Sequence, residues 1–256
     1  MRKKKGKGIY ILPNLLTSVS LFSGFYSMVA TIDKKFVYAS IAIFISAIFD
    51  MLDGRVARMT GSSSKFGVEY DSLSDVIAFG VAPGLLVYMW ALKGYGRFGW
   101  LAAFLYVACG ALRLARFNIQ VDGVQKKQFL GLPIPAAAST IAGAVLFNSW
   151  LDYRGVDLKT ILMPILVYIL AFLMVSDVRY ASFKDMAFFK GRPFRSTVVA
   201  IMLIVIIFFE PQVTLFGLTF FYLLSGPVYT LFRRKKIILE EASRSKGNLA
   251  DQDGHV

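Results

Sequence analysis

Histidine and cysteine are almost missing from this 256-residue chain, which contains one residue of each. Cys109 has no second cysteine to pair with, so the sequence excludes an intrachain disulfide and a cysteine-based metal cluster. His255 belongs to a polar tail, which argues against a histidine metal site or a histidine catalytic base. Acidic residues are also scarce, at 16 against 29 lysines and arginines. A metal site in this chain would therefore have to use carboxylate oxygens.

Long apolar runs without charge dominate the chain instead. Hydrophobic residues make up 56% of it, and the mean hydropathy is +0.59. Soluble domains are usually about 45–50% apolar, and a membrane-spanning helix needs roughly 20 mostly apolar residues. The runs predict an all-α integral membrane protein with about eight transmembrane helices, near residues 14–32, 36–56, 68–91, 98–117, 132–150, 160–177, 194–210 and 213–232.

The net charge of +13 follows this predicted topology, so we expect a lipid bilayer and no nucleic acid as partner. Eight spans place both termini on one side of the bilayer. Most lysines and arginines then fall on that side, and the opposite side receives only Lys34, Lys35, Lys93, Arg97, Arg154 and Lys159. Because lysine and arginine concentrate in cytoplasmic loops, we expect a cell-membrane protein with both termini on the cytoplasmic side.

The two ends of the chain differ from its apolar middle. The lysines of residues 1–13 predict a basic interfacial segment that meets anionic head groups. No small-residue cleavage site follows it, so a signal peptide is not expected. We expect one transmembrane catalytic domain over residues 14–232 and a polar cytoplasmic tail over residues 233–256.

Aspartates interrupt the apolar pattern on two neighbouring predicted helices. One face of the second helix, with spacing i, i+3, i+4, i+7 and i+8, carries Asp50, Asp53, Gly54, Ala57 and Arg58. One face of the third helix, with spacing i, i+4 and i+8, carries Gly67, Asp71 and Asp75. The linker between the helices is short, so we expect antiparallel neighbours. The two acid-bearing faces should then meet near the cytoplasmic membrane surface.

Ionisable side chains within a membrane are functional-site candidates by default. One aspartate near a helix end is more often a cap or a surface charge, but four on two matched faces need another explanation. Clustered carboxylates need cations, and oxygen ligands favour Mg²⁺ or Mn²⁺ over zinc, with Ca²⁺ also possible. Two such ions would hold a substrate diphosphate. Gly54, Ala57 and Gly67 would let a ligand approach the backbone, and Arg58 could reach a phosphate.

Residues 50–75 read D-x-x-D-G-x-x-A-R-x8-G-x3-D-x3-D without a departure. This segment resembles the signature of the CDP-alcohol phosphatidyltransferases. The resemblance implies that a phosphatidyl group passes from CDP-diacylglycerol to an alcohol with release of CMP, and it suggests a homodimer. It also implies two divalent cations on the four aspartates, with Asp75 as the base for the acceptor hydroxyl. Gly54 and Ala57 match positions that make room for cytidine, and Arg58 matches a diphosphate contact.

Other stretches bear on the acceptor alcohol. The bacterial phosphatidylserine synthase branch, whose acceptor is L-serine, is similar to this chain at LPNLLTSVSLFSGF (12–25), GALRLARFN (110–118) and FLGLPIPAAA (129–138). Arg113 and Arg116 end the fourth predicted span at the depth of the acids and would suit the serine carboxylate. They would equally suit the phosphate of glycerol 3-phosphate or an inositol phosphate, or would simply anchor the helix at the membrane surface.

Several alternatives remain open at this point. Asn14 and Thr17 could touch the nucleotide, or they could cap the helix that follows Pro13. An intramembrane prenyltransferase also uses aspartates and Mg²⁺, but it would show a second acid-rich motif. A transporter could couple buried acids to cations, yet the later spans carry almost no polar residues at their midplane.

Overall fold

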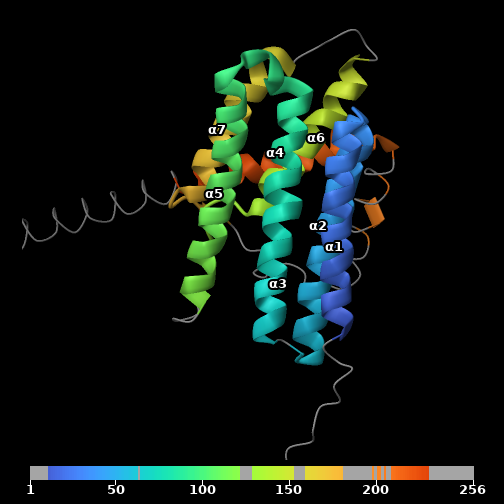
Figure 1. The fold of residues 1–256 in the computed structure, drawn as a ribbon, viewed down its shortest axis with the longest axis vertical. Helices are drawn as coiled ribbons and strands as arrows, with labels where there is room; N and C mark the ends of the chain where they lie inside the picture. Colours follow the sequence, from blue (N-terminus) through green and yellow to red (C-terminus); the bar gives the residue numbers. More distant parts are fainter. Residues whose placement is uncertain are drawn as a thin grey trace, which may run out of the picture.

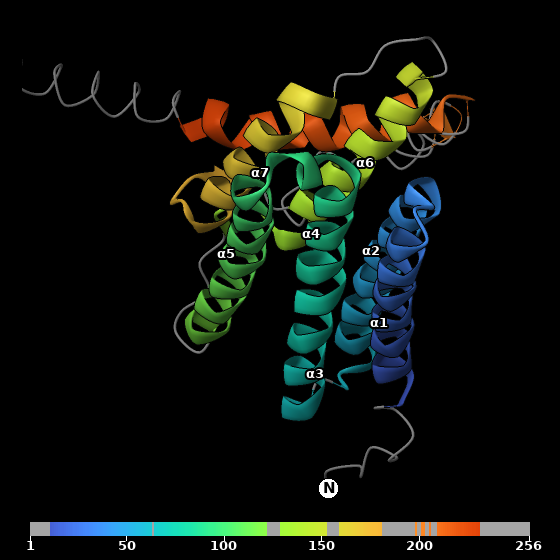
Figure 2. The same cartoon turned by 45° about the horizontal axis from the view of Figure 1, so that its top comes forward.

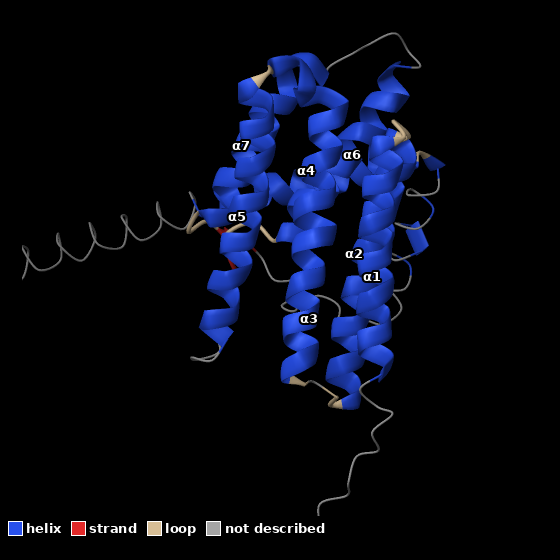
Figure 3. Ribbon diagram, viewed as in Figure 1, coloured by secondary structure: helices blue, strands red, loops and turns tan. Residues whose placement is uncertain are grey.

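The computed structural model describes residues 11–62, 64–121, 129–152, 159–180, 198, 201–202, 205 and 209–230. These residues are helical almost throughout (Figure 3), which confirms the all-α class. The α-helices of the described part are α1 (Ile11–Ile32), α2 (Phe36–Thr60), α3 (Lys65–Asp75), the short α4 (Ala82–Val87), α5 (Arg97–Val121), α6 (Ile134–Asp152), α7 (Lys159–Val175) and an unlabelled helix over Pro211–Thr230. Between α3 and α5, the chain also forms η2 (Val76–Val81), η3 (Tyr88–Leu92) and η4 (Lys93–Tyr95).

Six helices of the described part are long and apolar enough to cross a membrane: α1, α2, the continuous stretch Lys65–Tyr95, a stretch of α5, α6 and Pro211–Thr230. A seventh apolar helix, Leu162–Val175, is shorter. Large apolar side chains are exposed on several of them, as lipid-facing surfaces require; Phe22, for example, is 69% exposed. The membrane class is thus confirmed, whereas the predicted count of eight is not reached, because residues 194–210 lie mostly outside the described ranges.

The predicted ends of the membrane domain are only partly described. The helix α1 begins at Ile11, so the last residues of the predicted interfacial segment 1–13 belong to a helix. Residues 1–10 and the predicted tail 233–256 lie outside the described residues.

The helices α1 and α2, the stretch Lys65–Tyr95 and α5 run lengthwise beside one another (Figure 1). Small residues allow close packing there. The hydroxyls of Ser20 and Ser46 hydrogen-bond at 2.8 Å between α1 and α2. A Cβ on Gly24 would lie 2.7 Å from Ala78, so the α1 backbone directly contacts the stretch Lys65–Tyr95, which is the third span. Small-residue contacts of this kind hold membrane helices together where lipid provides no hydrophobic drive.

The turn between α2 and α3 brings the two acid-bearing helices together. Gly61 ends α2 with a φ of +58°, in the left-handed region that favours glycine. Ser64 then caps α3, since its hydroxyl accepts a hydrogen bond from the Gly67 amide at 3.0 Å. The chain therefore reverses within a few residues, as the linker length predicts.

A widened helical turn follows directly after Asp75. In η2, the amide of Ala82 bonds to the Ile77 carbonyl five residues back rather than four. The Tyr106 hydroxyl of α5 donates to the Phe79 carbonyl at 2.9 Å, and both residues are fully buried. Insertions of this type often lie at functional sites. Here the insertion lies between Asp75 and α4 and is bonded to α5 through Tyr106.

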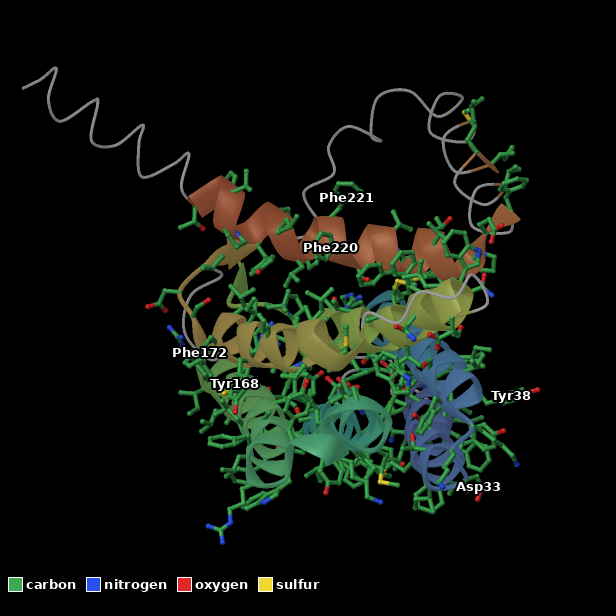
Figure 4. All side chains as sticks on the ribbon, turned by 90° about the horizontal axis from the view of Figure 1, so that it is seen from above. Asp33, Tyr38, Tyr168, Phe172, Phe220 and Phe221 are labelled. Carbon is green, nitrogen blue, oxygen red and sulfur yellow. The ribbon has the colours of Figure 1, made fainter. Side chains whose placement is uncertain are left out.

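The second half of the chain is arranged differently. Two short strands, β1 (Phe129–Leu130) and β2 (Arg179–Tyr180), pair antiparallel and were not predicted. The helix Pro211–Thr230 runs crosswise to the α1–α5 group (Figure 2). The Tyr180 hydroxyl anchors it by donating to the Leu223 carbonyl at 3.2 Å. Figure 4 shows Phe221 on the side of this helix that faces away from α6 and α7, and this side chain is 73% exposed.

Candidate active site

The four predicted aspartates lie together. The helix α2 supplies Asp50 and Asp53, and α3 supplies Asp71 and Asp75. One carboxylate oxygen each of Asp50, Asp53 and Asp71 can be chosen so that all three lie within 4.8 Å of one another. The Asp75 carboxyl lies within hydrogen-bonding reach of Asp50. The cluster sits between helices that begin or end at the lower end of the bundle in Figure 1.

Hydrogen bonds join α1 to both helices that carry the aspartates. The Thr17 hydroxyl donates to Asp53 Oδ2 at 2.7 Å, and both residues are buried. The Ser74 hydroxyl donates to the Thr17 carbonyl at 3.4 Å. Ser18 and Tyr70 join their hydroxyls at 2.8 Å. The helix α1 therefore sets the separation of α2 and α3, and with it the spacing of the acids.

Carboxylates this close repel one another unless cations lie between them. In the part of the chain that the structure describes, the ion pairs are Lys35–Asp33 and Arg116–Asp177, and neither includes a cluster aspartate. Opposite ligands of a Mg²⁺ ion lie about 4.2 Å apart, and those of Ca²⁺ up to about 5 Å. The chosen oxygens of Asp50, Asp53 and Asp71 lie no more than 4.8 Å apart, which is within the span of a Ca²⁺ shell and close to that of Mg²⁺. The donor set thus fits hard divalent cations.

A cavity of about 190 Å³ adjoins the cluster. Its lining comes from α1, α2, the turn and α3, and consists of Pro13, Asn14, Thr17, Asp53, Gly54, Ala57, Arg58, Ser62, Ser64, Gly67, Val68 and Asp71. The structure therefore brings together all six residues predicted to bind the CDP-lipid: Asn14, Thr17, Gly54, Ala57, Arg58 and Gly67. Asp50 and Asp75 lie beside this cavity rather than in its lining.

The glycines at this cavity are positions where a side chain would interfere. A Cβ on Gly67 would lie 3.1 Å from the Ser64 hydroxyl oxygen and 3.2 Å from Asn14 Oδ1. A Cβ on Gly54 would lie 3.2 Å from a terminal nitrogen of Arg58. Both glycines therefore leave room for the polar side chains that line the cavity.

The two arginines predicted for the acceptor lie outside that cavity and differ from each other. Arg113 is 8% exposed, and its Nε has no hydrogen-bond partner among the described residues. Its guanidinium lies within electrostatic reach of Asp75. Arg116, one turn nearer the end of α5, instead pairs with Asp177 at 2.7 Å. Only Arg113 is thus connected to the acid cluster.

Sequence reasoning missed several residues of this region. Ser62, Ser64 and Val68 line the cavity, and Asn118 donates to the Ser72 hydroxyl at 2.9 Å from α5. Ser64 could have been found, because a serine just before a helix is a common N-cap. The bond between Asn118 and Ser72 joins residues 46 positions apart, so no local pattern predicts it.

The helical bundle and its buried aspartate cluster define a membrane-embedded site of the kind that binds a diphosphate through divalent cations. Residues 10–175 match the model of the CDP-alcohol phosphatidyltransferase family. The chain belongs to this family and is a membrane transferase of phospholipid biosynthesis. Membership removes the prenyltransferase and transporter alternatives.

Similar proteins include the CDP-diacylglycerol–serine O-phosphatidyltransferase of Helicobacter pylori strain 26695. It is 37% identical over 233 residues, which cover 91% of this chain and 96% of the relative. The archaetidylserine synthase of Methanothermobacter thermautotrophicus is 40% identical over 182 residues, covering 70% of this chain and 73% of the relative. The CDP-diacylglycerol–serine O-phosphatidyltransferase of Methanocaldococcus jannaschii is 42% identical over 147 residues, covering 57% of this chain and 65% of the relative.

Proposed function

We propose that this chain transfers the phosphatidyl group of CDP-diacylglycerol to the hydroxyl of L-serine, which gives phosphatidylserine and CMP. The observation that carries the proposal is the aspartate cluster beside a cavity lined by Gly54, Ala57, Arg58 and Gly67. Relatives named as serine O-phosphatidyltransferases, similar over most of the chain, support serine as the acceptor.

The donor lipid would bind along α1, α2 and α3. Its CDP head would occupy the 190 Å³ cavity, with cytidine near Gly54 and Ala57 and the diphosphate between Arg58 and the acids. The four aspartates would hold two divalent cations, Mg²⁺ or Mn²⁺ with Ca²⁺ possible. Such ions, when bound, neutralise charge on the diphosphate and on departing CMP. Asn14 and Thr17 would border the nucleotide from α1.

The chemical step needs a base and an oriented acceptor. Asp75 would take the proton of the serine hydroxyl as its oxygen attacks the lipid-side phosphorus. A new oxygen–phosphorus bond forms, the bond to the CMP oxygen breaks, and CMP leaves with the electron pair. Arg58 would stabilise charge on the transferred phosphate. Arg113 would hold the serine carboxylate, since its buried guanidinium lies within electrostatic reach of Asp75.

The proposal also covers the membrane orientation, the domain bounds and the oligomeric state. We expect the active site and both termini on the cytoplasmic side of the cell membrane, a catalytic domain over residues 14–232, and a homodimer. The lysine and arginine distribution supports the orientation.

The test is CMP release from CDP-diacylglycerol by the purified protein in mixed micelles. We expect release only when both L-serine and Mg²⁺ or Mn²⁺ are present, with phosphatidylserine as the lipid product. Glycerol 3-phosphate and inositol phosphate, tested in parallel, should give little product. A preference for either phosphate-bearing alcohol would replace serine as the acceptor but leave the family chemistry intact.

A further inference from the structure

A second cavity, of about 310 Å³, lies at the end of the bundle where α1 turns into α2. Most of α1 separates it from Thr17 and the aspartate cluster, which is about 25 Å at the rise of an α-helix. Ligand-binding pockets begin at about 300 Å³ and combine apolar walls with a few polar groups. This upper cavity has that composition, since its lining consists of Lys34, Lys35, Phe36, Val37, Tyr38, Trp90, Val145, Ser149 and Asp152.

Lys34 has an unusual backbone conformation at the upper cavity. Its φ of +60° makes it the only non-glycine residue of the described ranges with a positive φ. The turn around it is a Schellman motif. The Lys34 amide donates to the Thr31 carbonyl at 3.0 Å, and the Lys35 amide donates to the Ala30 carbonyl at 2.8 Å. Glycine is the usual residue at this position, because it has no Cβ. A strained residue of this kind points to a function for its side chain.

A second widened helical turn brings Trp90 to the same cavity. In η3, the Lys93 amide bonds to the Tyr88 carbonyl five residues back. Such turns are frequent at functional sites. Trp90 is half-buried, and Val145 of α6 is only 1% exposed, so both form firm walls. Tryptophan and tyrosine rings favour the head-group level of a bilayer. Three separate elements thus meet at one cavity near that level.

The charged groups of the lining carry both signs and are not paired with one another. Among the described residues, Lys35 pairs with Asp33 at 3.4 Å, and Lys34 and Asp152 form no ion pair. Asp152 accepts a hydrogen bond from Asn148 Nδ2 at 2.8 Å. A cation and an anion held apart at one cavity suit a ligand that carries both charges. Phosphoethanolamine lipids have a phosphate and a primary ammonium group two carbons apart, next to apolar chains.

We propose that the upper cavity binds the head group of a phosphoethanolamine lipid, with the phosphate at Lys34 and the ammonium group at Asp152. Phe36, Val37 and Trp90 would contact the first carbons of its chains. Anchoring at the membrane surface would explain exposed lysines, but it would not explain the left-handed backbone or the cavity. The distance from the aspartates makes this a binding site separate from the proposed transfer reaction.

The experiment uses the fluorescence of Trp90, since the chain has three tryptophans. The parent variant Trp100→Phe/Trp150→Phe keeps Trp90 alone and is reconstituted in phosphatidylcholine vesicles. Lipids with brominated chains, which quench tryptophan on contact, are added as phosphatidylethanolamine, phosphatidylglycerol or phosphatidylcholine. We expect phosphatidylethanolamine to bind about fivefold more tightly than the other two, the factor that one lysine contributes to lipid binding. Equal quenching by all three lipids, or preference for phosphatidylglycerol, would overturn the proposal.

Lys34→Gly separates the side chain from the backbone. It relieves the left-handed strain, so the melting temperature in detergent should rise or stay constant, whereas the lipid preference should disappear. Asp152→Asn should remove the preference for phosphatidylethanolamine over phosphatidylcholine. Lys93→Gln, at a lysine of η4 outside the lining, is the control and should keep the preference.

A preference that persists in Lys34→Gly would remove Lys34 from the site. A preference that inorganic phosphate abolishes would assign the cavity to a soluble phosphate and not to a lipid. Quenching does not depend on CMP release, so failure of this proposal leaves the proposed function untouched.

Discussion

The donor side of the candidate site, on α1 to α3, is built from many residues close in sequence, whereas its acceptor side depends on few residues that are far apart. The four aspartates and the six residues predicted to bind the CDP-lipid fall within positions 14–75. On the proposed acceptor side, α5 carries Arg113, which alone of the two arginines is connected to the acids, and Arg116, whose partner Asp177 follows α7. Hard cations and a diphosphate demand fixed ligand types at fixed spacings, while an amino-alcohol can be held in more ways. The following predictions test this contrast, from the largest effect to the smallest.

The largest effect is expected at the base. Asp75→Asn removes the proton acceptor but keeps the size of the side chain, so turnover should fall by at least about 10³-fold, within the range for general-base catalysis. CMP release measures turnover, and metal-dependent binding of CDP-diacylglycerol should remain measurable. A variant with a near wild-type rate would remove Asp75 from the base role.

Thr17→Val tests whether α1 positions a metal-binding carboxylate. The change removes the hydroxyl that donates to Asp53 at 2.7 Å while keeping the shape of the side chain. Loss of a hydrogen bond to a ligand typically costs about 10–100-fold in metal affinity or activity. We expect a higher Mg²⁺ concentration for half-maximal CMP release.

The control for Thr17 is Thr31→Val on the same helix. Thr31 is also buried, but its hydroxyl donates to the Ser27 carbonyl of α1 itself. Its Mg²⁺ dependence should match that of the wild type. If both variants need the same extra Mg²⁺, the effect belongs to α1 in general and not to the contact with Asp53.

Gly67→Ala tests the cavity itself. The added methyl group would lie within 3.2 Å of Ser64 and Asn14 oxygens, so the lining must shift into the space of the donor head group. We expect the KM for CDP-diacylglycerol to rise by about tenfold, equivalent to about 1.4 kcal/mol, with a smaller change in the KM for L-serine. Gly217→Ala, where nothing lies within 4 Å of the new methyl, is the control. An unchanged donor KM in Gly67→Ala would place the head group elsewhere.

The same contrast explains how far the sequence predicts the molecule. The helical period alone places Asp50 with Asp53 and Asp71 with Asp75, and the structure joins both pairs in one cluster. The ion pair between Arg116 and Asp177 depends on the turn that connects α7 to β2, and no local sequence pattern predicts this contact. The crosswise course of Pro211–Thr230 is similarly set by distant contacts, such as the one from Tyr180. Apolar composition predicts that a helix lies in lipid, but it does not predict the direction of that helix relative to the others.

The smallest effect is expected at the widened turn that follows Asp75 and joins the proposed donor side to α5. Tyr106→Phe removes the hydroxyl that donates to the Phe79 carbonyl and leaves that buried carbonyl without this bond. An unpaired buried acceptor costs about 1–3 kcal/mol, so thermal stability in detergent should fall. If the turn also aims Asp75, kcat should drop a few-fold while both KM values stay constant. A loss of stability with unchanged kcat would show that Tyr106 supports the packing of α5 on the third span and does not position the base.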